Sequence, residues 1–89
     1  EFTKVVYNSF GDHIRVYPNP VYKFVKLTLP TQQNYMKIRL TDINGNEILA
    51  TSYRNLKEIQ LPLEIPQGIY LMNLINDKEQ QAIFRIIKK

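Results

Sequence analysis

Apolar and polar residues alternate along most of this 89-residue chain, and no segment shows a convincing period of 3.6 residues. In residues 25–29 and 36–40, for example, every second side chain is apolar. A period of two is typical of β-strands that bury one face. The pattern predicts seven or eight short strands, which lie within residues 4–9, 13–17, 23–29, 36–42, 47–53, 58–63, 69–75 and 82–87.

Turn-forming residues separate the predicted strands at short intervals. Asn44-Gly45 is a strong hairpin signal, because Gly45 adopts a positive φ without a Cβ clash and Asn44 tolerates one. Residues 76–79 form a second polar turn. Pro62 cannot donate to a ladder, so its strand should be short or at an edge. Together these features indicate an all-β sandwich or small barrel.

The pattern also predicts which side chains are buried. Residues 69–75 are apolar on both faces, so we expect both faces to be covered. In the second predicted strand, either Ile14 and Val16 or Arg15 and Tyr17 face the core, depending on the register.

The stretch Pro18-Asn19-Pro20 stops a predicted strand. Pro18 ends donation to the ladder, and Asn19 is restricted to extended geometry because a proline follows it. Pro20 should delay further pairing until Tyr22 or Lys23. We expect an extended, rigid corner, suited to carrying the chain from one sheet to the other.

Composition indicates one globular domain over residues 1–89, since 44% of the residues are hydrophobic and 22% are charged. A chain of this length has room for one modest core but not for a second lobe around a deep cleft. Cysteine is absent, which excludes disulfides and thiolate chemistry. The first ten residues do not form a signal peptide, so the chain is either intracellular or a piece of a longer exported protein.

The net charge of +4 arises from dispersed basic residues, of which only Lys88 and Lys89 are adjacent. Isolated lysines on strands protect sheet edges, and this interpretation is favoured over nucleic-acid binding. A single-strand binder would interleave aromatic and basic residues along a strand. Residues 22–24 (Tyr-Lys-Phe) and 35–37 (Tyr-Met-Lys) come nearest, but neither pattern continues, and we expect core aromatics beside solvated lysines.

Candidates for catalysis are weak. The only histidine, His13, is next to Asp12, and adjacent side chains on a strand point in different directions. Ser9 and Ser52 lie in bland surroundings, so no catalytic triad is expected. The sequence therefore predicts a protein that is not an enzyme.

A calcium loop is the nearest match to a metal site. Asp42, Asn44 and Asn46 match its first three ligand positions, but the sixth position is Glu47 instead of Gly and the twelfth is Tyr53 instead of Glu. We therefore favour a hairpin over a metal site at this position.

Four motifs follow one another in an order that is more specific than any one of them. They are residues 16–20 (Val-Tyr-Pro-Asn-Pro), 40–45 (Leu-Thr-Asp-Ile-Asn-Gly), 63–71 (Leu-Glu-Ile-Pro-Gln-Gly-Ile-Tyr-Leu) and a last strand ending in Lys88-Lys89. In this order they resemble the C-terminal sorting domain, type A, of proteins exported by the type IX secretion system of certain Gram-negative bacteria. The resemblance covers about residues 14–89.

The resemblance assigns recognition residues by match. The family often ends in Lys-x-x-x-Lys, where this chain has Arg85 and Lys89; arginine keeps the charge but changes the contact geometry, so Lys88 is a candidate to share the role. The other matched positions are Pro18, Asn19 and Pro20 in a Pro-Asn-Pro motif, Asp42 and Gly45 in an Asp-x-x-Gly hairpin, and Gly68 and Tyr70 in a Gly-x-Tyr motif.

The resemblance implies an immunoglobulin-like antiparallel β-sandwich that has no catalytic activity and no cofactor. Such a domain follows a cargo domain in the same precursor, is recognised in the periplasm and directs the cargo through an outer-membrane translocon. It is then typically removed by a sortase-like protease, and the cargo is secreted or stays on the cell surface. The implied partners are translocon, shuttle and sortase components.

The last predicted strand adds a separate expectation, because residues 84–89 are apolar and then basic. We expect its edge to be available for pairing with a partner, or for weak self-association. Two other functions stay open. One is a passive immunoglobulin-like or carbohydrate-binding module, although the chain has no Trp and its six Tyr are dispersed. The other is nucleic-acid binding, which would depend steeply on salt.

Overall fold

The structure is a computed structural model that describes residues 4–6 and 13–89. The described residues form six strands, and none of them forms a helix long and apolar enough to cross a membrane. The strands are β1 (Lys4–Val6), β2 (Arg15–Tyr17), β3 (Phe24–Asp42), β4 (Glu47–Pro62), β5 (Gly68–Asn76) and β6 (Gln81–Lys88).

There are fewer strands than the alternation predicts because two pairs of predicted strands are continuous. Segments 23–29 and 36–42 are the two ends of β3, and segments 47–53 and 58–63 fall in β4. The polar residues between them interrupt the apolar pattern but not the extended backbone. β3 and β4 pair as one long antiparallel hairpin, whose register shifts between Thr28 and Gln33 as it bends.

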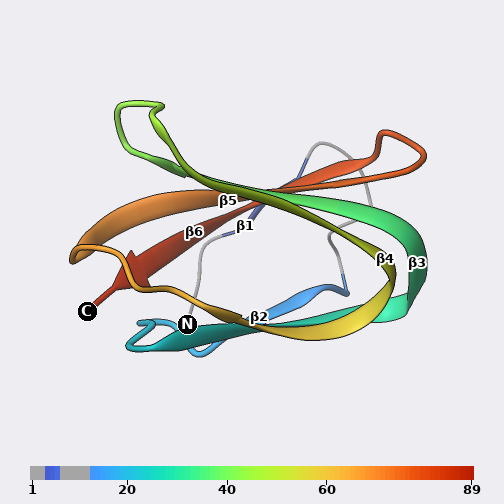
Figure 1. Cartoon of the computed structure of the whole chain (residues 1–89), viewed down its shortest axis with the longest axis horizontal. Helices are drawn as coiled ribbons and strands as arrows, with labels where there is room; N and C mark the ends of the chain where they lie inside the picture. Colours follow the sequence, from blue (N-terminus) through green and yellow to red (C-terminus); the bar gives the residue numbers. More distant parts are fainter. Residues whose placement is uncertain (1–3, 7–12) are drawn as a thin grey trace.

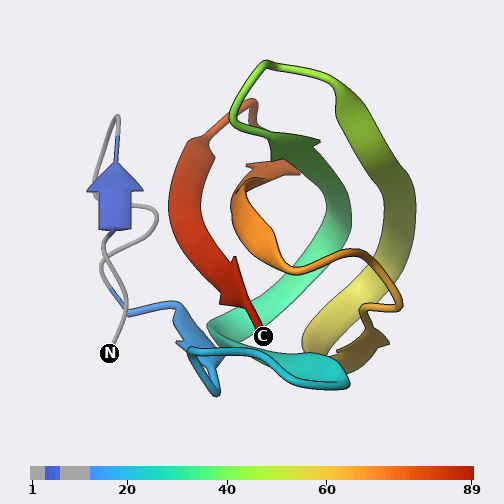
Figure 2. The same cartoon turned by 90° about the vertical axis from the view of Figure 1, so that its left-hand side faces the viewer.

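This bend folds the sheet into two layers (Figure 1). The first layer contains β2, the first part of β3 and the last part of β4. The second layer contains β1, β6, β5, the last part of β3 and the first part of β4. Figure 2 shows the two layers closing around the interior, which confirms the predicted sandwich. β4 pairs with β3 alone among the described strands, as expected for a strand that contains Pro62.

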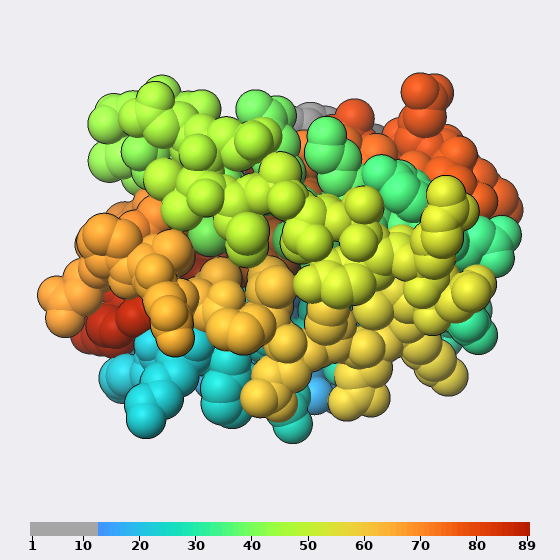
Figure 3. Space-filling model, viewed as in Figure 1, coloured from blue at the N-terminus to red at the C-terminus, as the bar shows by residue number. Residues whose placement is uncertain are grey.

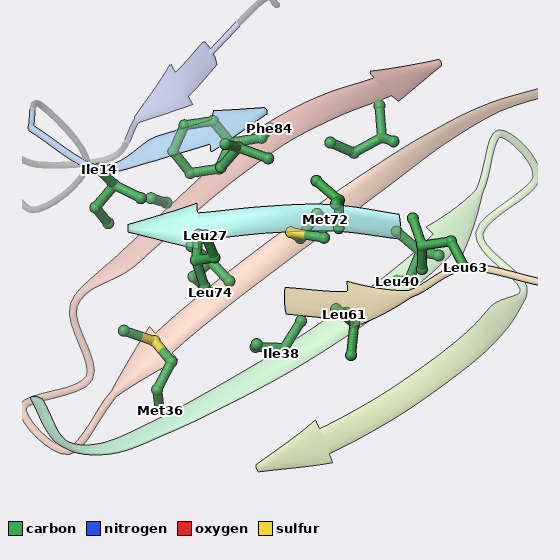
Figure 4. Close-up of a cluster of buried hydrophobic side chains, with 14 of the residues drawn as sticks. Ile14, Leu27, Met36, Ile38, Leu40, Leu61, Leu63, Met72, Leu74 and Phe84 are labelled. Carbon is green, nitrogen blue, oxygen red and sulfur yellow. The ribbon is translucent and has the colours of Figure 1, made fainter. Parts of the chain in front are cut away.

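The core lies between the layers and consists of the alternating apolar side chains (Figure 4). Leu27 from the first layer and Ile38, Met72 and Phe84 from the second are almost completely buried. Val16 is also buried while its neighbours on β2 are exposed, so the register that places Ile14 and Val16 inward is the correct one. Burying one such side chain contributes about 1.5–3 kcal/mol, so the two-residue period accounts for the choice of inner face.

Two expectations about burial are wrong. On the outer face of β5, Ile69 is 40% exposed and Leu71 is 38% exposed, because no described element covers the outside of the second layer. Tyr22 is 63% exposed and Phe24 is 37% exposed, because they lie on the corner after β2 and on the outer face of β3. An all-apolar segment therefore does not imply that both of its faces are covered.

Some of the weak catalytic candidates lie outside the described residues. Ser9 and Asp12 are among them, as is the second half of the predicted strand 4–9. His13 and Ser52 are described, and both side chains are exposed. Within the described ranges, no three His, Cys, Asp or Glu side chains gather closely enough to hold a metal ion.

Candidate functional site

The corner after β2 returns the chain within the first layer. Tyr17 pairs with Lys26, so β2 and β3 are antiparallel neighbours, and the expectation that the corner crosses between sheets is wrong. The Tyr17–Pro18 and Asn19–Pro20 peptide bonds are both cis.

The corner begins and ends in the first layer, but the side chain of Asn19 contacts β6 in the second layer. The side-chain Nδ2 of Asn19 donates to the carbonyl O of Arg85 at 3.2 Å, and the amide N of Ile87 donates to Asn19 Oδ1 at 3.0 Å. The amide of Asn19 thus offers β6 one donor and one acceptor, as a neighbouring strand would.

Val21 continues this pairing along β6. Its amide N donates to the carbonyl O of Ile87 at 2.7 Å, and the amide N of Lys89 donates to Val21 O at 2.8 Å, which makes a parallel bridge between Val21 and Lys88. Pairing therefore resumes at Val21, earlier than expected after Pro20. The sequence does carry one signal for this contact, because Val21 is an isolated apolar residue beside the motif.

These contacts correct the prediction about the terminal strand. The outer edge of β6 pairs with β1 over residues 82–84 and with Asn19 and Val21 over residues 85–89. The edge is therefore not available to a partner in this structure. The long unpaired edge in the described part of the chain belongs to β4, so edge-mediated self-association would use β4 instead.

The Gly-x-Tyr motif lies on the other side of β6. Gly68 pairs with Lys88 and Tyr70 pairs with Ile86. Gly68 has φ +155°, which L side chains rarely adopt, and the Tyr70 ring lies beside it. The Tyr70 hydroxyl donates to the carbonyl O of Pro66 at 2.7 Å, four residues upstream, as in the tyrosine corner of immunoglobulin-like sandwiches.

The Asp-x-x-Gly motif is the hairpin that the sequence predicts. Gly45 N donates to the carbonyl O of Asp42 at 3.1 Å, and Asp42 Oδ1 accepts from the amides of Asn44 and Asn46 at 2.9 Å each. Gly45 has φ +85°, and no atom lies within 4 Å of a Cβ built on it, so its backbone conformation and not lack of space favours glycine. Asn44 does not adopt a positive φ. Hydrogen bonds from the backbone and side chain of Asn46 lower the pKa of the Asp42 carboxyl, which stays ionised and holds the turn.

All four motifs therefore meet at one end of the sandwich. Asp42 pairs with Tyr70, Tyr70 pairs with Ile86, and Asn19 follows on the far side of β6. In Figure 1 this is the left-hand end, where the hairpin after β3, the connection before β5 and the C-terminus all lie. Two motifs far apart in sequence, Pro-Asn-Pro and Gly-x-Tyr, thus flank the last five residues, and the Asp-x-x-Gly hairpin lies one strand further along the sheet.

The basic residues lie within this enclosed strand. Arg85 is exposed, and its cross-strand partner is the partly exposed Leu71 of β5. Lys88 is on the opposite face of β6 because side chains alternate, so it does not share a face with Arg85. The Lys88 ammonium donates to the carbonyl O of Lys89 at 2.9 Å. That Lys88 shares the role of Arg85 and Lys89 stays a prediction, and it would act from the other face of β6.

Comparison with known proteins gives one family and one fold. The family model described as "Secretion system C-terminal sorting domain" matches residues 15–89. No curated protein sequence matches the chain. A crystal structure of a DUF3244 family protein with an immunoglobulin-like β-sandwich fold from Bacteroides vulgatus is similar, with a TM-score of 0.76 and 16% identity. The alignment covers 100% of this chain and 95% of that chain, and it shows an immunoglobulin-like fold.

Proposed function

Because this chain belongs to the family of secretion system C-terminal sorting domains, we propose that it is a non-catalytic sorting signal. The segment that the secretion machinery recognises is the last strand, which the other motifs hold in place. The family makes it a type IX sorting signal of a Gram-negative bacterium, which directs a protein to the cell surface or the medium. The domain passes through the periplasm with its N-terminal cargo, engages shuttle and translocon components, and is removed by a sortase-like protease.

The observation that supports this proposal is the pair of hydrogen bonds between Asn19 and β6. Most motif residues point inward or bond to their own chain, so they are poorly placed for direct contact with a partner. Asn19, Tyr70 and Asp42 are examples. Asn19 and Tyr70 are both next to the terminal strand, whose charged residues Arg85 and Lys89 are exposed. We infer that the motifs shape the strand and that the strand carries the recognised groups.

Export of a fused reporter tests this function. The reporter is placed before residues 1–89 and expressed in a bacterium with a type IX system, and reporter protein is measured in the medium and on the cell surface. We expect export of the intact fusion and retention of a fusion that lacks residues 85–89. Normal export of the truncated fusion would contradict the proposal, and export of neither fusion would favour a passive accessory module.

A second variant changes how β6 is held in place while its sequence stays the same. Asn19→Ala leaves Arg85 O and Ile87 N without their partner, which should destabilise the domain by about 1–3 kcal/mol and reduce export. Amide exchange at Ile87 should accelerate more than exchange at Tyr70. The matched control is Asn34→Ala, an exposed asparagine in the bend of β3, which should leave both export and exchange unchanged.

A further inference from the structure

The corner that pairs with β6 has a second, outward side. Asn19 and Val21 face the strand, while Pro18, Tyr22, Lys23 and Phe24 line a surface cavity of about 270 Å³. None of the functions assigned above uses this cavity. In Figure 3 the corner lies at the lower left against the end of β6, so the cavity and the terminal strand belong to the same end of the molecule.

The walls of the cavity are aromatic side chains that the core does not use. Tyr22 is 63% exposed and Phe24 is 37% exposed, and Pro18 adds a third rigid ring. Aromatic residues that line a concave surface supply much of the binding free energy at protein interfaces. The cavity is slightly smaller than the roughly 300–1,000 Å³ sites that hold drug-sized ligands, so its volume suits one large side chain.

The surroundings of the cavity are positively charged. Lys23 lines it, and the Val21 bridge brings the chain at Lys88 and Lys89 next to it. Within the described residues no ion pair joins Lys23 or Lys89 to a carboxylate, while the Lys88 ammonium donates to Lys89 O. One acidic residue, Glu64, is near Lys23, because the amide N of the preceding residue, Leu63, donates to Lys23 O. Positive charge therefore exceeds negative charge here, and the occupant that complements it is acidic.

We propose that this cavity is the docking pocket for an extended acidic segment of a protein partner, which inserts one aromatic ring between Tyr22 and Phe24 and places carboxylates near Lys23 and the end of β6. The inference rests on the proposed sorting function, because it describes the kind of partner that reads the terminal strand. One ring and a few carboxylates make a weak, reversible and salt-sensitive contact. Such a contact suits a sorting signal that passes from one component of the secretion machinery to the next.

The test is an NMR titration of the ¹⁵N-labelled 89-residue chain with the peptide acetyl-Glu-Glu-Phe-Glu-Glu-amide. We expect shifts in the amides of residues 21–24 and 88–89, which weaken as salt is added. Replacing Phe by Ala in the peptide should weaken binding about tenfold, since loss of a central aromatic contact typically exceeds 1 kcal/mol. A peptide with Lys in place of Glu should not bind.

Variants of the protein assign the binding to the cavity. Tyr22→Ala should weaken binding about tenfold and keep the fold, because the side chain is mostly exposed. Lys23→Gln should reduce the salt dependence. The matched control is Ile43→Ala, which removes a 72% exposed apolar side chain from the same end of the sandwich and should bind like the unchanged protein.

Three outcomes overturn the inference: no shifts at millimolar peptide, equal binding of the Phe and Ala peptides, or shifts centred away from residues 18–24. Each differs from a failure of the sorting function. If the intact reporter fusion is exported while the peptide fails to bind, the docking pocket is wrong and the sorting function stands. If the peptide binds and no fusion is exported, the pocket serves a different partner and the sorting function is wrong.

Discussion

Two hairpin turns of this protein have the same hydrogen-bond pattern but are built from different residues. In residues 42–46 and 76–80, the fourth amide donates to the first carbonyl and the first amide donates to the fifth carbonyl. In both, the first side chain accepts from the third and fifth amides. In both, the fourth residue has a positive φ. The same backbone therefore has two different side-chain solutions.

The difference lies in the side chains that hold each turn. The first turn uses a carboxylate, Asp42, and Gly45 at the positive φ of 85°. The second uses an amide, Asn76, which is 4% exposed, and Glu79 at a φ of 61°. Asn76 also donates to Gln80 Oε1 at 2.8 Å and to Gln33 Oε1 at 3.2 Å. The first turn is self-contained, whereas the second is tied into the neighbouring strand.

The position of each turn fits this difference. The first turn stands beside the motifs around the terminal strand, and the second lies at the opposite end, where β3 bends between the layers (Figure 1). The carboxylate of Asp42 is held by its own loop, so the loop keeps its shape without neighbours. Asn76, in contrast, connects the turn to Gln33 in the bend. We infer that the second turn stabilises the fold by joining β5 to the bend of β3. The first turn keeps its own shape next to the Gly-x-Tyr motif.

Asn76→Ala should have the largest effect. It removes four side-chain hydrogen bonds at a buried position, so we expect a loss of about 2–3 kcal/mol in the free energy of unfolding. Denaturant unfolding measures this loss. Asp77→Ala, in the same turn but exposed, is the control and should stay within about 0.5 kcal/mol of the unchanged protein. A similar loss in both variants would show that the Asn76 network contributes little.

The two turns also show what the sequence can reveal. Asn44-Gly45 is a local signal, and it correctly places the first hairpin. The turn requires a positive φ, and whether a residue adopts one easily depends on that residue alone. Residues 76–79 are correctly predicted to be a turn, but the buried network of Asn76 depends on Gln33, 43 residues away. Local propensity contains no information on such a contact.

The same limit explains the errors at the candidate site. The period of two correctly assigns the inner faces, such as the burial of Leu27 and Phe84, because burial acts on each strand separately. The pairing of Asn19 with β6 joins residues 66 and 68 positions apart. It depends on which strands become neighbours, and alternation does not fix this. The prediction of a free terminal edge failed for that reason.

Gly45→Ala should have the second largest effect, with a loss of about 1 kcal/mol, since a side chain at positive φ is strained. No atom lies within 4 Å of a Cβ built at this position, so the loss measures backbone strain alone. Thermal unfolding gives the value. Gly45→Asn is the control, because asparagine tolerates a positive φ and should lose less. If Ala and Asn variants unfold alike, positive φ is not the reason for glycine in the first turn.

Glu79→Gly should make the second turn resemble the first and raise stability by about 0.5 kcal/mol. Relief of strain at a φ of 61° outweighs the entropy that glycine loses on folding. The matched control is Lys78→Gly, one residue earlier, where φ is not positive. That variant should lose about 0.5–1 kcal/mol, and a gain in both variants would contradict the strain argument.

Asp42→Asn should have the smallest effect at neutral pH and should sharpen the comparison at low pH. The pKa of Asp42 is lowered in the folded chain, chiefly by the Asn46 amide, so ionised Asp42 stabilises the fold above the pKa of the unfolded chain. This contribution is lost as the pH falls through the lower, folded-state pKa. The Asn variant, which resembles the second turn, lacks this titration. Denaturant unfolding from pH 6 to pH 2 should therefore show a shallower loss of stability for Asp42→Asn than for the unchanged protein. Parallel curves would mean that ionisation of Asp42 does not contribute to the pH dependence of stability.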